Sequence, residues 1–97
     1  KTMESVMTYT HKYRTSADPK EVDNVPEWLD NQLREALNTS IAIAHYCRGE
    51  ELDNTQLVIL DEESIKVLPV GLFCMDGKLF EVEITISYTI QQLRVTL

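Results

Sequence analysis

The sequence predicts an α+β domain in which one helix packs on a small, strongly curved antiparallel sheet, or SH3/Sm-like barrel, of about five strands. The first observation is a strict alternation over residues 80–90, with apolar side chains at even positions and polar ones at odd positions. This predicts one long strand with one buried face. The second is a helical pattern over residues 25–38, followed by short apolar runs between turn residues. We expect one domain over residues 1–97: an N-terminal strand or arm and loop (1–24), the helix (25–38) and the barrel-like sheet (41–97).

The N-terminal segment is compatible with two structures. From Met7 to Arg14, apolar or aromatic residues and His11 alternate with threonine, lysine and arginine, which favours a threonine-rich strand. A helix is the alternative, with Met3, Val6, Met7 and Thr10 along one side. Residues 15–24 contain Ser16, Asp18, Pro19 and Asn24 and are predicted to form a loop.

The helix has start and stop signals. Asn24 followed by Glu27 resembles a capping box, and Pro26 suits the first turn, where a missing N–H costs least. One face of the helix carries Leu29, Leu33, Ala36 and Leu37. Asn38 is expected to end the helix in a left-handed cap.

Four strands are expected after the helix. Residues 41–46 alternate between isoleucine or histidine and alanine or tyrosine, and are predicted to form a strand that turns at residues 48–51. Residues 55–60 form a second short strand, and residues 61–64 turn again. Ile65 then leads into a hairpin made by residues 68–73 and 80–90.

The hairpin register can be argued from the side chains. A two-residue loop at Asp76-Gly77 would pair Phe73 with Phe80 and mix charged and apolar side chains on one face. The three-residue loop Met75-Asp76-Gly77 instead pairs Leu72 with Phe80, Val70 with Val82, and Leu68 with Ile84, so we expect that loop. Beyond Gln92 the apolar residues move to odd positions, which predicts a bulge or a new strand there.

Charge and composition narrow the function. Sixteen acidic residues against nine basic ones give a net charge of −7, which disfavours generic nucleic-acid binding by this domain. The acidic clusters at residues 50–53 and 61–63 are expected to be solvated loop tips. Two cysteines favour a reduced, cytoplasmic protein, and no apolar run reaches membrane-spanning length.

Candidate chemistry is sparse. His45 and Cys47 lie two apart, so on a strand they would share a face and could begin a metal site or a thiol–imidazole pair. No second pair of ligands completes that pattern, so a small apolar cysteine beside a partly exposed histidine is preferred. Glu81 and Glu83 also share a strand face and are expected to be solvated. We expect no enzyme activity, no metal and no cofactor.

Several short segments resemble the WYL domain of bacterial regulators, a Sm-like barrel. The pair Ala36-Leu37 precedes the predicted strand ending at Tyr46, as in that family, and Pro69-Val70-Gly71-Leu72 matches its Pro-x-Gly-Leu stretch. Gly77-Lys78-Leu79-Phe80 aligns with the region of the Trp-Tyr-Leu triplet, although Leu79 and Phe80 replace Trp and Tyr. The last strand carries Arg94, as the family's arginine-bearing strand does.

This resemblance implies a non-enzymatic regulatory module that binds a ligand or partner. It nominates one pocket, made by Tyr46, Phe80 and Arg94 with Arg48 and Lys78 at its rim. From the residues alone, a solvated Arg94 and a core Phe80 are the competing interpretation. There are two alternatives to the regulatory module. One is a structural or protein–protein interaction domain whose free strand edge pairs with another chain, a second copy included. The other is an acidic inhibitor or phosphate mimic that binds a basic protein surface. We expect the partner to be a protein or a small, anionic ligand, and we expect no binding to a membrane.

Overall fold

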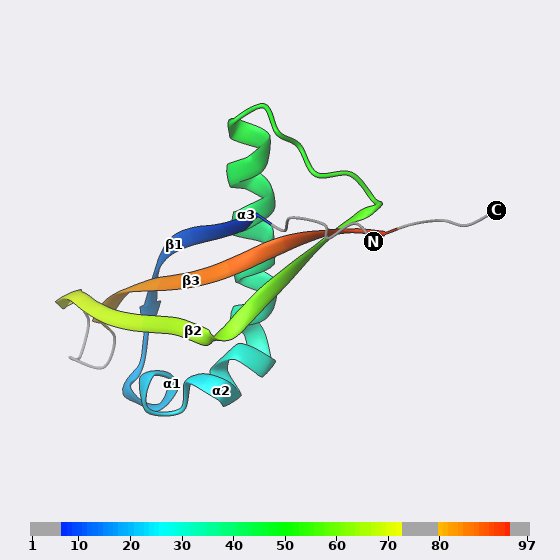
Figure 1. The fold of residues 1–97 in the computed structure, drawn as a ribbon. Coiled ribbons are helices and arrows are strands. Elements are labelled where there is room, and N and C mark those ends of the chain that lie inside the picture. Colours follow the sequence, from blue (N-terminus) through cyan, green and yellow to red (C-terminus); the bar gives the residue numbers. More distant parts are fainter. Residues whose placement is uncertain (1–6, 73–79, 94–97) are drawn as a thin grey trace.

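The computed structural model describes residues 7–72 and 80–93, which form one antiparallel sheet with helices on one of its faces (Figure 1). In chain order the elements are β1 (Thr8–Ala17), α1 (Pro19–Asp23), α2 (Val25–Trp28), the π-helical turn η1 (Leu29–Leu33), α3 (Arg34–Cys47), β2 (Gln56–Leu72) and β3 (Phe80–Gln92). The strand order is β1-β3-β2, so β3 lies in the centre. The predicted α+β class, with a helix on an antiparallel sheet, is confirmed.

The sheet differs from the expected one in strand number and closure. Among the described residues it has three strands rather than about five, and these do not close into a barrel. One reason is that residues 41–46 belong to α3 and not to a strand. The other is that residues 56–60 and 65–72 are parts of the single strand β2.

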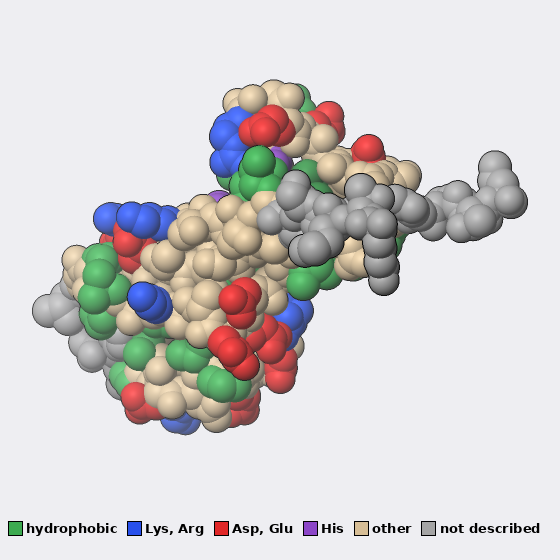
Figure 2. All heavy atoms as spheres, in the orientation of Figure 1, with side chains coloured by type: hydrophobic (Ala, Val, Ile, Leu, Met, Phe, Trp, Pro, Cys, Tyr) green, Lys and Arg blue, Asp and Glu red, His purple; other side chains and the backbone are tan. Residues whose placement is uncertain are grey.

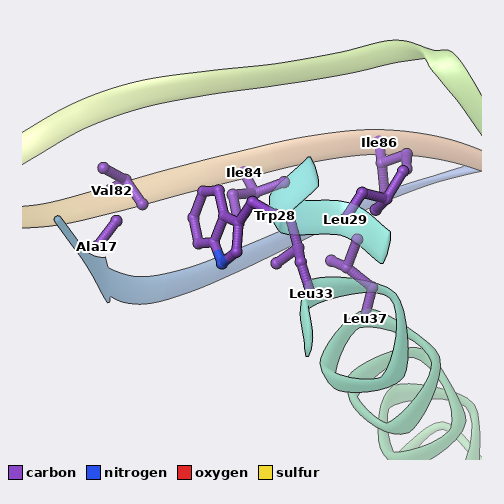
Figure 3. Close-up of a cluster of buried hydrophobic side chains, with 8 residues drawn as sticks. All are labelled: Ala17, Trp28, Leu29, Leu33, Leu37, Val82, Ile84 and Ile86. Atoms are coloured by element: carbon purple, nitrogen blue, oxygen red, sulfur yellow. The ribbon is translucent and has the colours of Figure 1, made fainter. Parts of the chain in front are cut away.

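The alternating segment forms the centre of the fold, as predicted. On β3 the even-numbered side chains of Val82, Ile84, Ile86 and Tyr88 are buried, and the odd-numbered ones between them are half-buried. Val82, Ile84 and Ile86 meet Trp28, Leu29, Leu33 and Leu37 of the helical segment and Ala17 of β1 (Figure 3). The core is therefore a single layer between β3 and the helices.

The N-terminal strand is confirmed, but most of the loop predicted over residues 15–24 is wrong, because residues 15–17 are strand and residues 19–23 are helix. Residues 15–17 complete β1, and Asp18 caps the short helix α1. The Asp18 side chain accepts from the N–H of Glu21 at 2.9 Å, and the Glu21 carboxylate accepts from the N–H of Asp18 at 3.0 Å. This reciprocal pair is a capping box, which was not predicted from the sequence.

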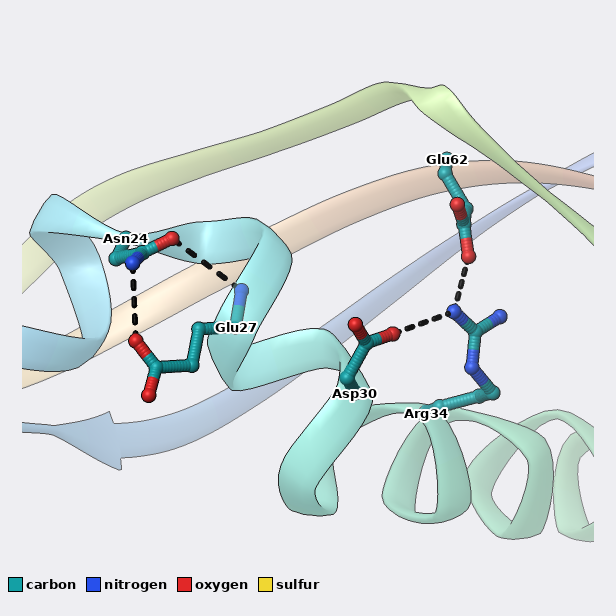
Figure 4. A network of polar contacts seen from close by, with 5 residues as sticks. All are labelled: Asn24, Glu27, Asp30, Arg34 and Glu62. Carbon is teal, nitrogen blue, oxygen red and sulfur yellow. Dashed lines mark hydrogen bonds and ion pairs between the residues drawn. The ribbon is translucent and has the colours of Figure 1, made fainter.

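The predicted start of the main helix is confirmed. Asn24 caps α2: its Oδ1 accepts from the N–H of Glu27 at 3.3 Å, and its amide donates to the Glu27 carboxylate at 2.9 Å (Figure 4). Pro26 lies in the first turn. Farther along, Arg34 donates to Asp30 at 3.3 Å and to Glu62 of β2, which ties the start of α3 to that strand.

The predicted helix end at Asn38 is wrong, because α3 continues to Cys47. The buried residues Leu29, Leu33, Leu37, Ile41 and His45 are spaced four apart. An α-helix has 3.6 residues per turn, so a strict four-residue repeat drifts around the axis by about 40° at each step. The wider turn η1, closed by the N–H of Arg34 on the carbonyl of Leu29, takes in one extra residue and offsets part of this drift.

Strand β2 contains two irregularities that the sequence analysis did not predict. Its pairing with β3 shifts between Asp61 and Lys66, where a turn was expected, and again between Pro69 and Gly71. The predicted pair of Leu72 with Phe80 is confirmed.

The other two predicted hairpin pairs are wrong. Val82 lies opposite Pro69 rather than Val70, and Ile84 lies opposite Val67 rather than Leu68. Leu68 is 59% exposed, and Val70 is also exposed, because the bulge turns them outward while Ile65 and Val67 pack against the core. The expected loop Met75-Asp76-Gly77 and the segment after Leu93 lie outside the described residues.

Candidate functional site

A groove of about 670 Å³ runs between β1 and α3 and is open to solvent. Its lining combines one aromatic side chain of β1 with small and polar side chains and one large apolar side chain along one flank of the helical segment. The lining residues are Tyr13, Gln32, Glu35, Ala36, Thr39, Ser40 and Ile43. Ile43 is 57% exposed there, although it is a large apolar side chain. The opposite flank of the same segment is the one that Arg34 ties to β2.

The strand beside this groove is regular and lies at one edge of the sheet that the structure describes. All ten residues of β1 pair with β3 in unbroken register from Thr8 to Ala17. On its other side, no strand among the described residues pairs with β1. An edge strand presents outward-pointing N–H and C=O groups that can pair with another chain.

The other edge strand is less suited to pairing. Strand β2 is interrupted by two register shifts, contains Pro69, and carries the acidic residues Asp61, Glu62 and Glu63. Bulges, proline and charges are the features that prevent an edge from pairing with other strands. The two edges of this sheet are therefore unequal: β1 also carries charges, at Lys12 and Arg14, but it has neither a register shift nor a proline.

Hydrophobic surface elsewhere does not point to one site. In Figure 2, green hydrophobic side chains reach the visible face in several separate places, next to acidic and basic ones. Exposed apolar residues outside the groove include Leu57, Ile59 and Leu68 of β2. Single exposed apolar residues are normal on protein surfaces, whereas a groove beside a free strand edge is a specific arrangement.

A cluster of histidine and tyrosine side chains continues from the groove toward the end of α3. His45 and Tyr88 are both 2% exposed, and the His45 Nε2 atom lies 2.7 Å from the Tyr88 hydroxyl. The Tyr9 ring stacks on Tyr88 with 5.1 Å between centroids and meets His45 edge-on at 5.3 Å. Across the groove, the Nε2 atom of His11 lies 2.8 Å from the Ser40 hydroxyl. These contacts fix β1 against α3.

His11 is the titratable group of this cluster with a perturbed pKa. Partial burial lowers the pKa of His11 below its ordinary value, and the nearby Arg48 and His45 lower it further. A neutral imidazole at pH 7 is thus favoured where β1 crosses to α3.

This pKa predicts a pH dependence of stability. Between the lowered pKa and 6.5, the unfolded chain binds a proton that the folded protein does not, so the free energy of unfolding should fall as the pH drops below 6.5. The loss should stop once the folded protein binds the proton as well. Urea unfolding of the parent and of His11→Gln from about pH 8 to pH 5 measures this, and the variant should lose less stability. Equal losses in the two proteins would contradict it.

The structure places three of the residues nominated for a ligand pocket. Tyr46 lies on α3 with 65% of its surface exposed. Arg48 is the first residue after the end of α3, and its Nε donates to Glu50 at 3.1 Å. The Tyr88 hydroxyl and the Glu50 carboxylate raise the pKa of Arg48. Tyr46 follows His45, which contacts Tyr88, whereas Phe80 begins β3, eight residues or about 26 Å along the strand from Tyr88. Tyr46 and Phe80 are therefore not brought together.

The rest of that pocket prediction stays untested. Lys78, Arg94 and the side chain of Phe80 lie outside what the structure describes. The segment ending at Tyr46 is helical, so this part of the resemblance to the WYL domain does not carry over.

His45 and Cys47 do not share a face. Two residues apart on a helix point in nearly opposite directions, so His45 is buried while Cys47 is exposed. In the part of the chain described, no three side chains of His, Cys, Asp or Glu gather as a metal site. The thiol–imidazole pair considered from the sequence depended on a strand that is in fact a helix.

Several acidic residues have structural roles beyond solvation. Glu81 and Glu83, on the sheet face away from α3, both pair with Arg14, at 3.5 and 3.3 Å. Asp53 accepts from the N–H and the hydroxyl of Thr55, and these bonds lower the pKa of its carboxyl. Glu35, in contrast, makes no ion pair with any described residue, and it lines the groove.

The groove was not predicted from the sequence, because residues 41–46, at its far end, were predicted to form a strand. The signal was present: Ala36, Thr39 or Ser40, and Ile43 follow helical spacing along one flank. No family model matches the chain, and no curated protein or solved structure matches it either. Within residues 7–72 and 80–93, none of the helices has the length and apolar character needed to cross a membrane.

Proposed function

We propose that the chain is a non-enzymatic regulatory binding module that binds an extended segment of a partner protein. The segment pairs with the free edge of β1, and its alternate side chains enter the groove against α3. Main-chain hydrogen bonds supply much of the affinity in this mode of recognition, and the groove supplies specificity.

One observation carries this proposal. The outer edge of β1, a strand of regular register over Thr8–Ala17, borders the groove that the helix flank forms. A strand added at this edge directs every second side chain toward the helix side of the sheet. Small side chains at Ala36, Thr39 and Ser40 leave room for them.

The shape of the groove favours a protein segment over a small ligand. Sites for small molecules usually enclose most of the ligand's surface, whereas this groove is open to solvent. A bound segment gains main-chain hydrogen bonds that a small ligand cannot make along β1. The buried pair of His45 and Tyr88 supports a structural role for this cluster, because 2% exposure of each leaves no access for a substrate.

Selection of binders from a library of random twelve-residue peptides tests the proposal. We expect the enriched peptides to slow hydrogen exchange of amides in β1 on binding. Ile43→Asp, at the groove, should weaken their binding at least about tenfold, which corresponds to about 1.4 kcal/mol. Titration calorimetry measures the affinity.

The matched control is Ala42→Asp, the same added charge on the neighbouring exposed residue, which does not line the groove. It should change the affinity by less than about twofold. Equal effects of the two variants on peptide affinity would contradict the proposal, and so would slowed hydrogen exchange in β2 instead of β1.

A further inference from the structure

The helix and the edge strand beside the groove run in opposite directions. Tyr9 contacts His45, and His11 meets Ser40. At the other end, Ala17 belongs to the same buried cluster as Trp28 and Leu29. A segment that pairs antiparallel with β1 therefore runs in the same direction as α3.

The chemistry of the groove changes along that direction. Gln32 and Glu35 lie at its beginning, small side chains lie in its middle, and Ile43 lies at its end. From Glu35 to Ile43 the helix rises about 12 Å, at 1.5 Å per residue. Four residues of an extended strand span about 13 Å, so three alternate side chains of a bound segment match these three parts of the groove.

The first part of the groove favours a positively charged side chain on the bound segment. Glu35 is exposed and forms no ion pair with another described residue, and the chain as a whole carries −7. A basic side chain over Glu35 gains a charge-assisted hydrogen bond, and an acidic one is repelled. About 6 Å farther along the helix, the short side chains of Thr39 and Ser40 leave room for an apolar side chain. At the end of the groove, an apolar side chain beside Ile43 buries exposed apolar surface.

We infer that the bound segment carries a lysine or arginine, followed at the second and fourth positions after it by apolar side chains. The basic residue meets Glu35, the first apolar residue covers the short side chains of Thr39 and Ser40, and the second contacts Ile43. This inference rests on the proposed function and adds the chemistry and the direction of the segment.

A second copy of the chain does not supply this pattern. If β1 of a second copy paired with β1 and kept its helix on the same face, the side chains entering the groove would be those of Tyr9, His11, Tyr13 and Thr15, none of them lysine or arginine. A pairing centred on Lys12 would also place two lysines opposite each other, which is destabilising. The occupant is therefore a different protein.

Three capped peptides test the inference. The probe is Thr-Lys-Thr-Val-Thr-Ile-Thr, and one control replaces its lysine with glutamate. The other control reverses the order of the residues. We expect the probe to bind at least about tenfold more tightly than the glutamate peptide, and more tightly than the reversed one.

Two variants of the protein test whether Glu35 causes the preference for the lysine peptide. Glu35→Gln should reduce the ratio between the lysine and glutamate peptides to within about threefold, whereas Glu63→Gln, the same charge removed from β2, should leave it unchanged. Equal binding of the two peptides to the parent would overturn the inferred chemistry. If selected library peptides still slowed exchange in β1, the proposed function would stand.

Other outcomes are equally decisive. Failure of all three peptides, with library peptides that bind at β1 but lack the basic-apolar pattern, overturns the inference alone. Failure of every peptide overturns the inference and the proposed function together. A dimer by sedimentation equilibrium, with β1 amides protected in it, overturns the choice of a different protein as occupant.

Discussion

Truncating Leu37 to alanine is expected to lower the free energy of unfolding by about 2–5 kcal/mol. The Leu37 side chain is fully buried and lies in the layer between the helices and β3, beside Leu33 (Figure 3). Its removal loses the transfer free energy of three carbon atoms and leaves a cavity that the surrounding side chains fill only in part. Urea unfolding followed by circular dichroism measures the change.

The matched control is Leu57→Ala, the same truncation on β2, where the leucine is 46% exposed. We expect a change below about 1 kcal/mol there, because less apolar surface is lost and no closed cavity forms. A small effect at Leu37, or equal effects at both sites, would show that the helix does not pack on the sheet as described.

The strand at the centre of the fold was predictable because two signals agreed. From Val82 to Tyr88 the apolar period is two, and the residues are β-branched or aromatic, so pattern and propensity both favour a strand. The cap at Asn24 and the proline in the first turn were predictable for a similar reason, because both act locally. The Asn24 side chain satisfies a backbone N–H, and Pro26 has no N–H to leave unsatisfied.

The end of α3 was not predictable in this way. Residues 41–46 alternate in side-chain size, yet both isoleucine and alanine also occur in helices, and a short apolar run does not distinguish the two structures. What decides is the four-residue repeat continuing through Ile41 to His45, which buries both residues. That repeat is visible only when the segment is joined to the helix before it.

The register of β2 was undetermined because two sets of residues are nearly equivalent. Leu68 and Val70 form one apolar set, and Ile65 and Val67 form the other on the opposite face. Without the bulge at Val70, the first set would face the core; with it, the second does. The groove beside β1 depends on the length of α3 and not on the register of β2, because it lies where the longer helix runs alongside β1.

Replacing Tyr88 with phenylalanine is expected to cost about 1–3 kcal/mol of folding free energy, although it removes a single oxygen atom. The Tyr88 hydroxyl lies 2.7 Å from His45 Nε2, and the imidazole is 2% exposed. Without the hydroxyl, a buried ring nitrogen loses its partner, since water has little access to it. Tyr46→Phe, the same change on the exposed neighbour of His45, should stay within about 0.5 kcal/mol.

The double variant His45→Phe/Tyr88→Phe separates the hydrogen bond from packing. If the cost of Tyr88→Phe comes from the unsatisfied imidazole, the loss of both polar groups should cost less than the sum of the two single variants, because no orphaned polar atom remains. Additive costs would instead assign the effect to side-chain shape. The comparison bears on the proposed function as well, since Tyr88 stacks on Tyr9 and thereby holds β1 beside α3, where the partner segment is to bind.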